Sequence, residues 1–222
     1  APAGPDGRSP ALAVSAPQRR RLVLASANPK KVTELADILG ESCEVVPRPA
    51  GVPDVVENGA TLVANARLKA VAIAEAVGEA AVADDTGLEV DALGGAPGVR
   101  SARYAGEPPD DAANVAKLLT ALEGVPEGER TARFRTVVVV RWPDGHEVVT
   151  EGVAEGRIVG EPRGAGGFGY DPVFVPADGD GRTFAEMDAS TKHTISHRGR
   201  ALRSLLAVMT RDRWPDDPSA GA

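Results

Sequence analysis

Two adjacent carboxylates are candidates for metal chemistry. Asp84 and Asp85 follow the apolar residues 81–83 and precede Thr86-Gly87. Carboxylates at the end of a buried strand suit Mg²⁺, a hard cation that prefers oxygen ligands and keeps several of its waters. Glu57 lies upstream in a polar loop and could join them. The alternative is a turn that the aspartate side chains cap, and the residues alone leave both interpretations open.

The polar segment at residues 26–31 is a candidate phosphate site, because it follows an apolar run at residues 22–25. A helix that begins here would present free N–H groups and the positive end of its dipole, and both favour a phosphate. Asn28 fits the N-cap of this helix, and Pro29 fits its first position. The alternative is a plain helix start with solvated lysines. The candidate phosphate-binding residues are Ser26, Ala27, Asn28, Pro29, Lys30 and Lys31.

A glycine-rich loop at residues 164–169 carries aromatic residues. The chain has only four phenylalanines and two tyrosines, and one of each lies at residues 168–170. This concentration favours a platform that lets a flat ring approach the backbone, although the aromatics could instead pack into the core. The candidate ligand-binding residues are Phe168, Gly169, Tyr170 and Asp171.

A fourth segment, residues 192–199, gathers cationic groups in an acidic protein. Lys192, His197 and Arg198 lie near a predicted helix start, which favours a second anion-binding set. His193 lacks a partner at metal-ligand spacing, and we expect it to be exposed. We expect no metal at His197, because the carboxylates already offer a site for a hard cation.

The elements that must position these segments alternate along the first half of the chain. Helices are predicted over residues 29–39, 61–77, 111–122 and from 196 or 197 to 209, and strands over residues 22–25, 43–46, 81–83, 88–93 and 172–175. Residues 132–142 and 146–159 flank Pro143-Asp144-Gly145, a strong hairpin signal. We therefore expect an α/β fold with a mixed, elongated central sheet flanked by helices, and two lobes with an active-site cleft between them.

Composition excludes several classes of protein. The 222 residues are 42% hydrophobic and 26% charged, which is ordinary for a folded domain. No apolar run approaches the roughly 20 residues that span a bilayer. The net charge of −7 argues against nucleic-acid and membrane-surface partners. The single cysteine excludes an intramolecular disulfide and a cysteine-based zinc cluster, and a cytoplasmic protein is the simplest expectation.

The ends of the chain differ from its middle in composition. Residues 1–18 are rich in Pro, Ala and Gly, lack the pattern of a secretory signal and are expected to form a disordered extension. Residues 213–222 are expected to form a loose tail. Residues 19–212 are then expected to form a single two-lobed domain.

Four stretches of the chain, in this order, resemble the inosine/xanthosine triphosphate pyrophosphatases, the RdgB/Ham1-like house-cleaning enzymes. They are LVLASANPKKVTEL, VADDTGLEVDALGGAPGVRSARYAG, GGFGYDPVF and KHTISHRGRAL. Each is a weak motif alone, whereas four in order with familiar spacing are highly specific. The resemblance implies Mg²⁺-dependent hydrolysis of XTP, dITP and ITP to the monophosphate and pyrophosphate by a homodimer.

The resemblance also implies roles for individual residues. Asp85 would be the general base and a metal ligand, Glu57 a second ligand and Asp84 the flanking carboxylate. Residues 26–31 would bind the triphosphate. The remaining base and phosphate contacts would come from Thr86, Phe168, Gly169, Tyr170, Asp171, Lys192, His197 and Arg198.

This sequence departs from the family pattern at three positions. Ala64 stands where the family usually has a glutamate, which removes a possible carboxylate from the metal site. Ala27 and Lys30 stand where glycines are frequent, which alters the expected geometry of the phosphate loop.

Two other functions compete with this one. A Maf-like nucleotide pyrophosphatase would share the architecture and act on other nucleotides, but the Phe-Gly-Tyr-Asp and Ser-His-Arg segments favour the first family. A non-catalytic nucleotide-binding module is disfavoured by the carboxylates Glu57, Asp84 and Asp85.

Overall fold

A computed structural model describes residues 20–211 of the chain. The extension predicted at residues 1–18 and the tail predicted at residues 213–222 lie outside the described residues. Within the described range, no helix combines the length and the apolar character that crossing a membrane requires.

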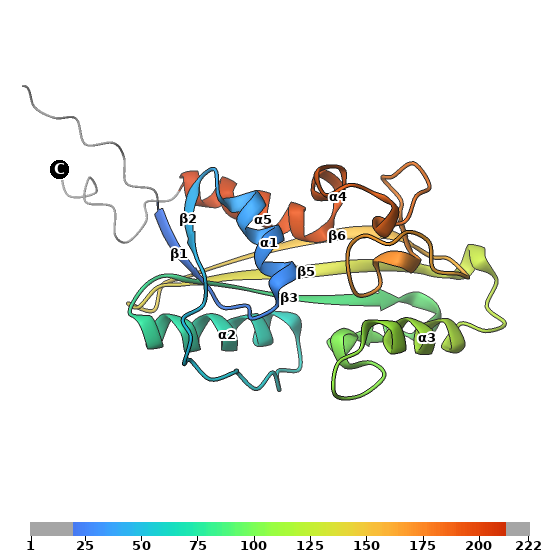
Figure 1. Cartoon of the computed structure of the whole chain (residues 1–222), viewed down its shortest axis with the longest axis horizontal. Coiled ribbons are helices and arrows are strands. Elements are labelled where there is room, and N and C mark those ends of the chain that lie inside the picture. Colours follow the sequence, from blue (N-terminus) through green and yellow to red (C-terminus); the bar gives the residue numbers. More distant parts are fainter. Residues whose placement is uncertain (1–19, 212–222) are drawn as a thin grey trace, which may run out of the picture.

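Seven strands form one mixed sheet along the long axis of the molecule (Figure 1). They are β1 (Arg20–Leu24), β2 (Cys43–Val46), β3 (Ala81–Val90), β4 (Pro97–Gly98), β5 (Thr131–Arg141), β6 (Glu147–Ile158) and β7 (Phe174–Pro176). The order is β2-β1-β3-β5-β6-β7, and β4 pairs with β3. β1 runs parallel to β2 and β3, whereas the other pairs are antiparallel.

The long hairpin of β5 and β6 forms the middle of this sheet and confirms the prediction. Its register runs from Arg141 opposite Glu147 to Thr131 opposite Arg157. The valines at residues 137–140 are all buried, because helices cover both faces of this part of the sheet.

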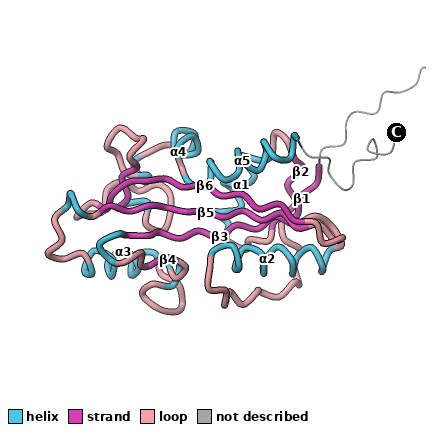
Figure 2. Tube along the Cα trace, turned by 180° about the vertical axis from the view of Figure 1, so that it is seen from behind, coloured by secondary structure: helices cyan, strands magenta, loops and turns pink. Residues whose placement is uncertain are grey.

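Helices flank the sheet on both faces (Figures 1 and 2). They are α1 (Pro29–Leu39), α2 (Leu62–Val77), α3 (Asp111–Ala121), α4 (Ala189–Ile195) and α5 (His197–Arg211). α1 and α5 pack Leu35 and Leu202 against Val138 on one face. α2 packs Ile73 against Val139 on the other face. A third apolar cluster, around α3 and β7, fills the far end of the sheet, so the expected mixed α/β fold is confirmed.

The chain enters α5 through α4, a helix that the sequence analysis did not predict. The Asp188 side chain caps α4 by accepting the N–H of Thr191 at 2.8 Å. Lys192 and His193 therefore lie in the last turn of α4 and not at the start of α5. His193 is partly buried, so the expectation that it is exposed is wrong.

β3 continues through both carboxylates, so the prediction that Asp84 and Asp85 lie at a strand end or in a turn is wrong. One edge of β3 pairs with β5 along its whole length. The other edge pairs with β1 only at residues 81–82 and with β4 only at residues 88–89. Residues 84–87 thus have no strand partner on that side within the described chain. This gap exists because β1 ends early and the chain turns into α1.

Candidate active site

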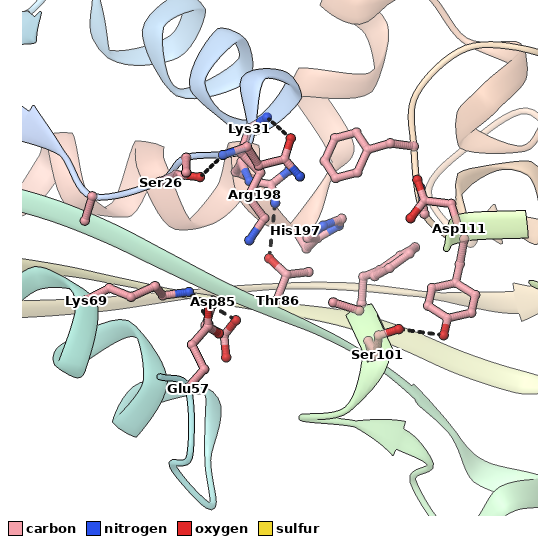
Figure 3. Close-up of a pocket in the computed structure, with 18 of the residues that line it drawn as sticks. Ser26, Lys31, Glu57, Lys69, Asp85, Thr86, Ser101, Asp111, His197 and Arg198 are labelled. Atoms are coloured by element: carbon pink, nitrogen blue, oxygen red, sulfur yellow. Dashed lines mark hydrogen bonds and ion pairs between the residues drawn. The ribbon is translucent and has the colours of Figure 1, made fainter. Parts of the chain in front are cut away.

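A pocket of about 450 Å³ lies at the gap in β3 (Figure 3). Its walls come from the β1–α1 loop and α2 at one end, and from the glycine-rich loop and α3 at the other. Most of the predicted site residues line it, namely Ser26, Ala27, Asn28, Lys31, Glu57, Asp85, Thr86, Phe168, Gly169, Tyr170, Asp171, Lys192, His197 and Arg198. Pro29, Lys30 and Asp84 are not among its lining residues.

Asp84 faces α1 and α5, where its carboxylate neutralises two cations. Its Oδ2 lies 3.3 Å from the Nζ of Lys31 and accepts hydrogen bonds from Nε and Nη2 of Arg198 at 3.2 and 3.1 Å. Burial alone would raise the pKa of this carboxyl, but Lys31 and Arg198 outweigh it and hold the pKa well below its usual range. Asp84 is an anchored counter-ion outside the pocket, although its Oδ1 is also buried without a hydrogen-bond partner among the described residues. Because its carboxylate faces α1 and α5 and not the pocket, the geometry does not favour its predicted place in a metal site.

Asp85 faces the opposite side of β3, toward α2, because successive side chains of a strand alternate. Its Oδ1 lies 3.5 Å from the Nζ of Lys69, and the same ammonium lies 3.3 Å from Oε2 of Glu57 (Figure 3). Asp85 Oδ2 is buried without a hydrogen-bond partner in the described part of the chain. Burial raises the pKa of Asp85, and attraction by Lys69 offsets only part of this shift.

Asp85 and Glu57 form the part of the pocket that fits a divalent cation. No group of three His, Cys, Asp or Glu side chains that could hold a metal occurs among residues 20–211. The two carboxylates nevertheless converge on one ammonium, and Asp85 keeps an unsatisfied oxygen. A buried carboxylate oxygen needs a donor or a cation. The pair therefore fits a hard cation that keeps most of its own waters.

The segment that begins α1 has the predicted cap, but its amides are not free. Asn28 Oδ1 accepts the N–H groups of Lys30 and Lys31 at 3.0 and 3.4 Å. Ser26 Oγ accepts the N–H of Asn28 at 3.2 Å. The expectation of free N–H groups for a phosphate is therefore not met by the first two amides of the helix. The Lys31 side chain remains in the pocket, and burial lowers its pKa although Asp84 opposes the shift.

The two aromatic residues of the glycine-rich loop both line the pocket but differ in burial. Tyr170 is buried in the cluster around α3, and its hydroxyl donates a hydrogen bond to the carbonyl oxygen of Ser101 at 2.8 Å. Phe168 lies in the pocket wall, with Lys192 Nζ 5.1 Å and Arg198 Cζ 5.4 Å from its ring centre. The core interpretation is thus correct for Tyr170, while Phe168 lies where a ligand ring could meet it.

Asp171 holds the conformation of the same loop through hydrogen bonds to its carboxylate. Its Oδ2 accepts hydrogen bonds from the N–H of Phe168 and from Lys192 Nζ, both at 2.8 Å. A Cβ at Gly167 would lie 2.1 Å from this oxygen, and the φ of Gly167 is +68°, so the loop requires glycine there. Burial raises the pKa of Asp171 although Lys192 opposes the shift.

His197 and Arg198 begin α5, and both are buried. His197 stacks on Phe134 with ring centres 4.5 Å apart, and its Nδ1 lacks a hydrogen-bond partner in the described chain. Burial, followed by the charges of Arg198 and Lys192, lowers the pKa of His197 well below its ordinary value, so the imidazole is neutral at pH 7. The Arg198 guanidinium donates hydrogen bonds to Asp84, Thr86 and Glu34.

A profile of the Ham1 family matches residues 22–208. The chain belongs to the Ham1 family. A dITP/XTP pyrophosphatase of Desulforamulus reducens is 52% identical over 194 residues, which cover 86% of this chain and 96% of that protein. A dITP/XTP pyrophosphatase of Streptomyces coelicolor is 46% identical over 197 residues, which cover 85% and 96%.

Solved structures show the same Ham1 fold. A HAM1 protein from Coxiella burnetii has a TM-score of 0.79 and 42% identity, with 87% of this chain and 100% of that chain covered. A nucleoside-triphosphatase / dITP/XTP pyrophosphatase from Mycobacterium abscessus has a TM-score of 0.68 and 45% identity, with coverage of 85% and 99%. The resemblance found in the sequence is therefore confirmed at the level of the Ham1 family.

Two partly buried charges of this Ham1 site were missed in the sequence. Lys69 lies one helical turn after Asn65, on the face of α2 that meets β3, and this spacing could have indicated it. Glu34 lies one turn after Lys31, and its carboxylate pairs with Lys192 at 2.8 Å and with Arg198. Lysine and glutamate in a helix are usually solvated, so neither stood out.

The cationic side chains of the Ham1 pocket are all paired with carboxylates. Its cationic lining residues are Lys31, Arg48, Lys69, Lys192 and Arg198. Each lies within 4 Å of at least one carboxylate. An equal number of carboxylates lines the same pocket, namely Asp54, Glu57, Asp85, Asp111 and Asp171. The pocket thus offers no surplus of positive charge to a polyanion.

Proposed function

We propose that this chain hydrolyses the noncanonical purine nucleoside triphosphates XTP, dITP and ITP to the monophosphate and pyrophosphate, with Mg²⁺ as cofactor. The observation that carries the proposal is the convergence of Glu57 and the unsatisfied Asp85 in a pocket that Lys31 and Phe168 also line. The names of the Ham1 relatives agree with this reaction and with these substrates.

The charge balance of the pocket supports a metal cofactor. A triphosphate carries about four negative charges at neutral pH. The lining cations are already paired, so the phosphates need a further cation, and Asp85 and Glu57 are the residues that would hold it. Mg²⁺ bound there would supply Lewis acidity to the phosphates and acidify a bound water.

The chain's own residues would do the proton transfer and the positioning. Asp85 would accept a proton from a water whose oxygen attacks the α-phosphorus, while the bond from that phosphorus to the bridging oxygen breaks and pyrophosphate leaves. Burial raises the pKa of Asp85, which makes it a stronger base than an ordinary carboxylate. Lys31 and Lys192 would stabilise the charge that develops on the leaving group.

Selection among bases would rest on hydrogen-bond donors aimed at the C6 oxygen of the purine. Neutral His197 has one N–H to donate, and Phe168 offers a ring face. The C6 amino group of adenine is itself a hydrogen-bond donor, so it would face the donor of the protein without forming a hydrogen bond. Each such unpaired group costs about 1–3 kcal/mol. GTP shares the C6 oxygen, so its rejection must use the 2-amino group.

The deciding experiment measures pyrophosphate release from ITP, XTP, dTTP, UTP, ATP and GTP, with Mg²⁺ and with a chelator. The proposal expects release from ITP and XTP, dependence on the metal and at most slow release from ATP and GTP. Preference for dTTP or UTP would instead indicate the Maf-like activity. Binding of ITP without release would indicate a non-catalytic module.

The family resemblance implies a homodimer, and the single cysteine makes the cytoplasm the simplest expectation for the compartment. Light scattering of the purified chain tests the first point. A mass of one chain at micromolar concentration would contradict it.

A further inference from the structure

The Lys69 ammonium lies where a cation shared by Glu57 and Asp85 would lie. Its Nζ is 3.3 Å from Glu57 Oε2 and 3.5 Å from Asp85 Oδ1. The Lys69 side chain is 12% exposed and projects from α2 into the pocket (Figure 3). One side chain therefore occupies the position between the two carboxylates that fit the metal.

We propose that Lys69 is the resident counter-ion of the Glu57–Asp85 pair, so that a divalent cation must displace its ammonium and binds weakly to the nucleotide-free protein. When a nucleotide enters, its phosphates give the displaced ammonium a new partner. The inference rests on the proposed function, because it assumes that these carboxylates hold the metal.

Charge and geometry both indicate that a divalent cation displaces the Lys69 ammonium and does not bind beside it. Two cations within about 4 Å of each other repel strongly in a partly buried site. Asp84 also attracts the Lys69 ammonium, but its carboxylate faces the opposite side of β3 and is already paired with Lys31 and Arg198. Residue 64, where a glutamate could add negative charge, is alanine in this chain.

Lys69 can leave its position without disturbing the fold. Its charge sits at the end of a flexible four-carbon stem, and the stem borders the open pocket. The phosphates of a bound nucleotide would lie in that pocket. Entry of the nucleotide would thus free both carboxylates for the metal and keep the lysine neutralised.

Mn²⁺ binding to the nucleotide-free protein tests the first part. Electron paramagnetic resonance of unbound Mn²⁺ gives the dissociation constant for the wild type and for Lys69→Met. We expect at least tenfold tighter binding in Lys69→Met, and loss of this gain in the double variant Lys69→Met with Glu57→Gln. Arg67→Met is the matched control, because it removes one positive charge from the same helix at a side chain that pairs with Glu147 outside the pocket.

Equal Mn²⁺ affinity in wild type and Lys69→Met would overturn the inference, and so would an equal gain in Arg67→Met. If Lys69→Met does not fold, as judged by circular dichroism, Lys69→Gln replaces it with the same expectation. Lys69→Arg should stay as weak as the wild type, because it retains the cation. No turnover enters these measurements, so their outcome is independent of whether the chain cleaves ITP.

Binding of a nucleotide analogue tests the second part. The dissociation constant of the α,β-methylene analogue of ITP is measured by calorimetry without metal. We expect Lys69→Met to weaken binding at least tenfold and Arg67→Met to leave it unchanged. Equal affinity of wild type and Lys69→Met for the analogue would show that the Lys69 ammonium does not pair with the phosphates.

Discussion

Asp84 and Asp85 are consecutive in β3, yet their carboxylates face opposite sides of the sheet and their pKa values shift in opposite directions. Asp84 is a buried counter-ion of Lys31 and Arg198. Asp85 lies in the pocket with one oxygen unsatisfied and with its pKa raised by burial. Substitution of Asp84 should therefore lower the stability of the fold, whereas substitution of Asp85 should lower the rate of catalysis.

Asp85→Asn should reduce kcat by at least about 100-fold, because the amide can neither accept the proton nor hold a cation as the carboxylate does. The melting temperature should change little, since the substitution keeps the volume of the side chain. Pyrophosphate release and thermal unfolding measure the two effects. Retention of more than about a tenth of the wild-type rate would remove Asp85 from the role of base.

Asp84→Asn should instead destabilise the protein, by about 3 kcal/mol or more, because it leaves two buried cations without their shared anion. Urea unfolding of this variant beside Asp85→Asn gives the comparison. Similar free energies of unfolding for both variants would contradict the assignment of Asp84 as a structural counter-ion.

Glu34→Gln should lower stability in a pH-dependent way. Burial alone would raise the pKa of Glu34, but Arg198 and Lys192 reverse the shift and lower it below 4.5. A lowered pKa in the folded state contributes stability that is present above the unfolded pKa and is lost as the pH falls through the folded pKa. The difference in unfolding free energy between wild type and variant should be about 2 kcal/mol at pH 7 and shrink below pH 4.5. A difference independent of pH between 3 and 7 would contradict this.

His197→Ala should lower the ratio of kcat/KM for ITP over ATP by roughly tenfold, because it removes a donor aimed at the keto base. Arg198→Ala should affect both substrates alike, since its guanidinium is held by Asp84, Thr86 and Glu34. Kinetics with both nucleotides decide the matter. An equal loss of ITP and ATP hydrolysis in His197→Ala would assign base selection to Phe168 or to backbone groups.

Removal of residues 1–18 should leave the melting temperature and ITP hydrolysis unchanged. Their composition provides too little apolar surface to offset the entropy of ordering them. Thermal unfolding and pyrophosphate release are compared before and after truncation. A large loss in either would show that these residues contact the domain.

The sequence was sufficient for those elements whose local signals agree with their tertiary setting. Asn28 and Pro29 marked the start of α1, and residues 143–145 marked the hairpin. The extension of β3 through Asp84 and Asp85 was not predictable, because charged residues are depleted in strands and only α1, α2 and α5 supply their partners.

Contacts between helices that are distant in the sequence were the other feature that could not be predicted. In the sequence, Glu34 has the pattern of a solvated helix residue. Its partner Lys192 lies 158 positions later, and only the fold brings the two together. By contrast, the fit of Asn28 to an N-cap position already indicates that its side chain satisfies the amides expected to bind phosphate.

The pairing of every cation in the pocket affects which anions the protein meets in a cell. With a net charge of −7, the molecule repels small anions at long range, and its pocket offers them no unpaired lysine or arginine on arrival. We therefore expect orthophosphate, sulfate and carboxylate metabolites to compete poorly for the site. A nucleotide that arrives with its own divalent cation carries less negative charge and meets less repulsion. We expect its association rate to rise with salt, the reverse of what a positively charged pocket would show.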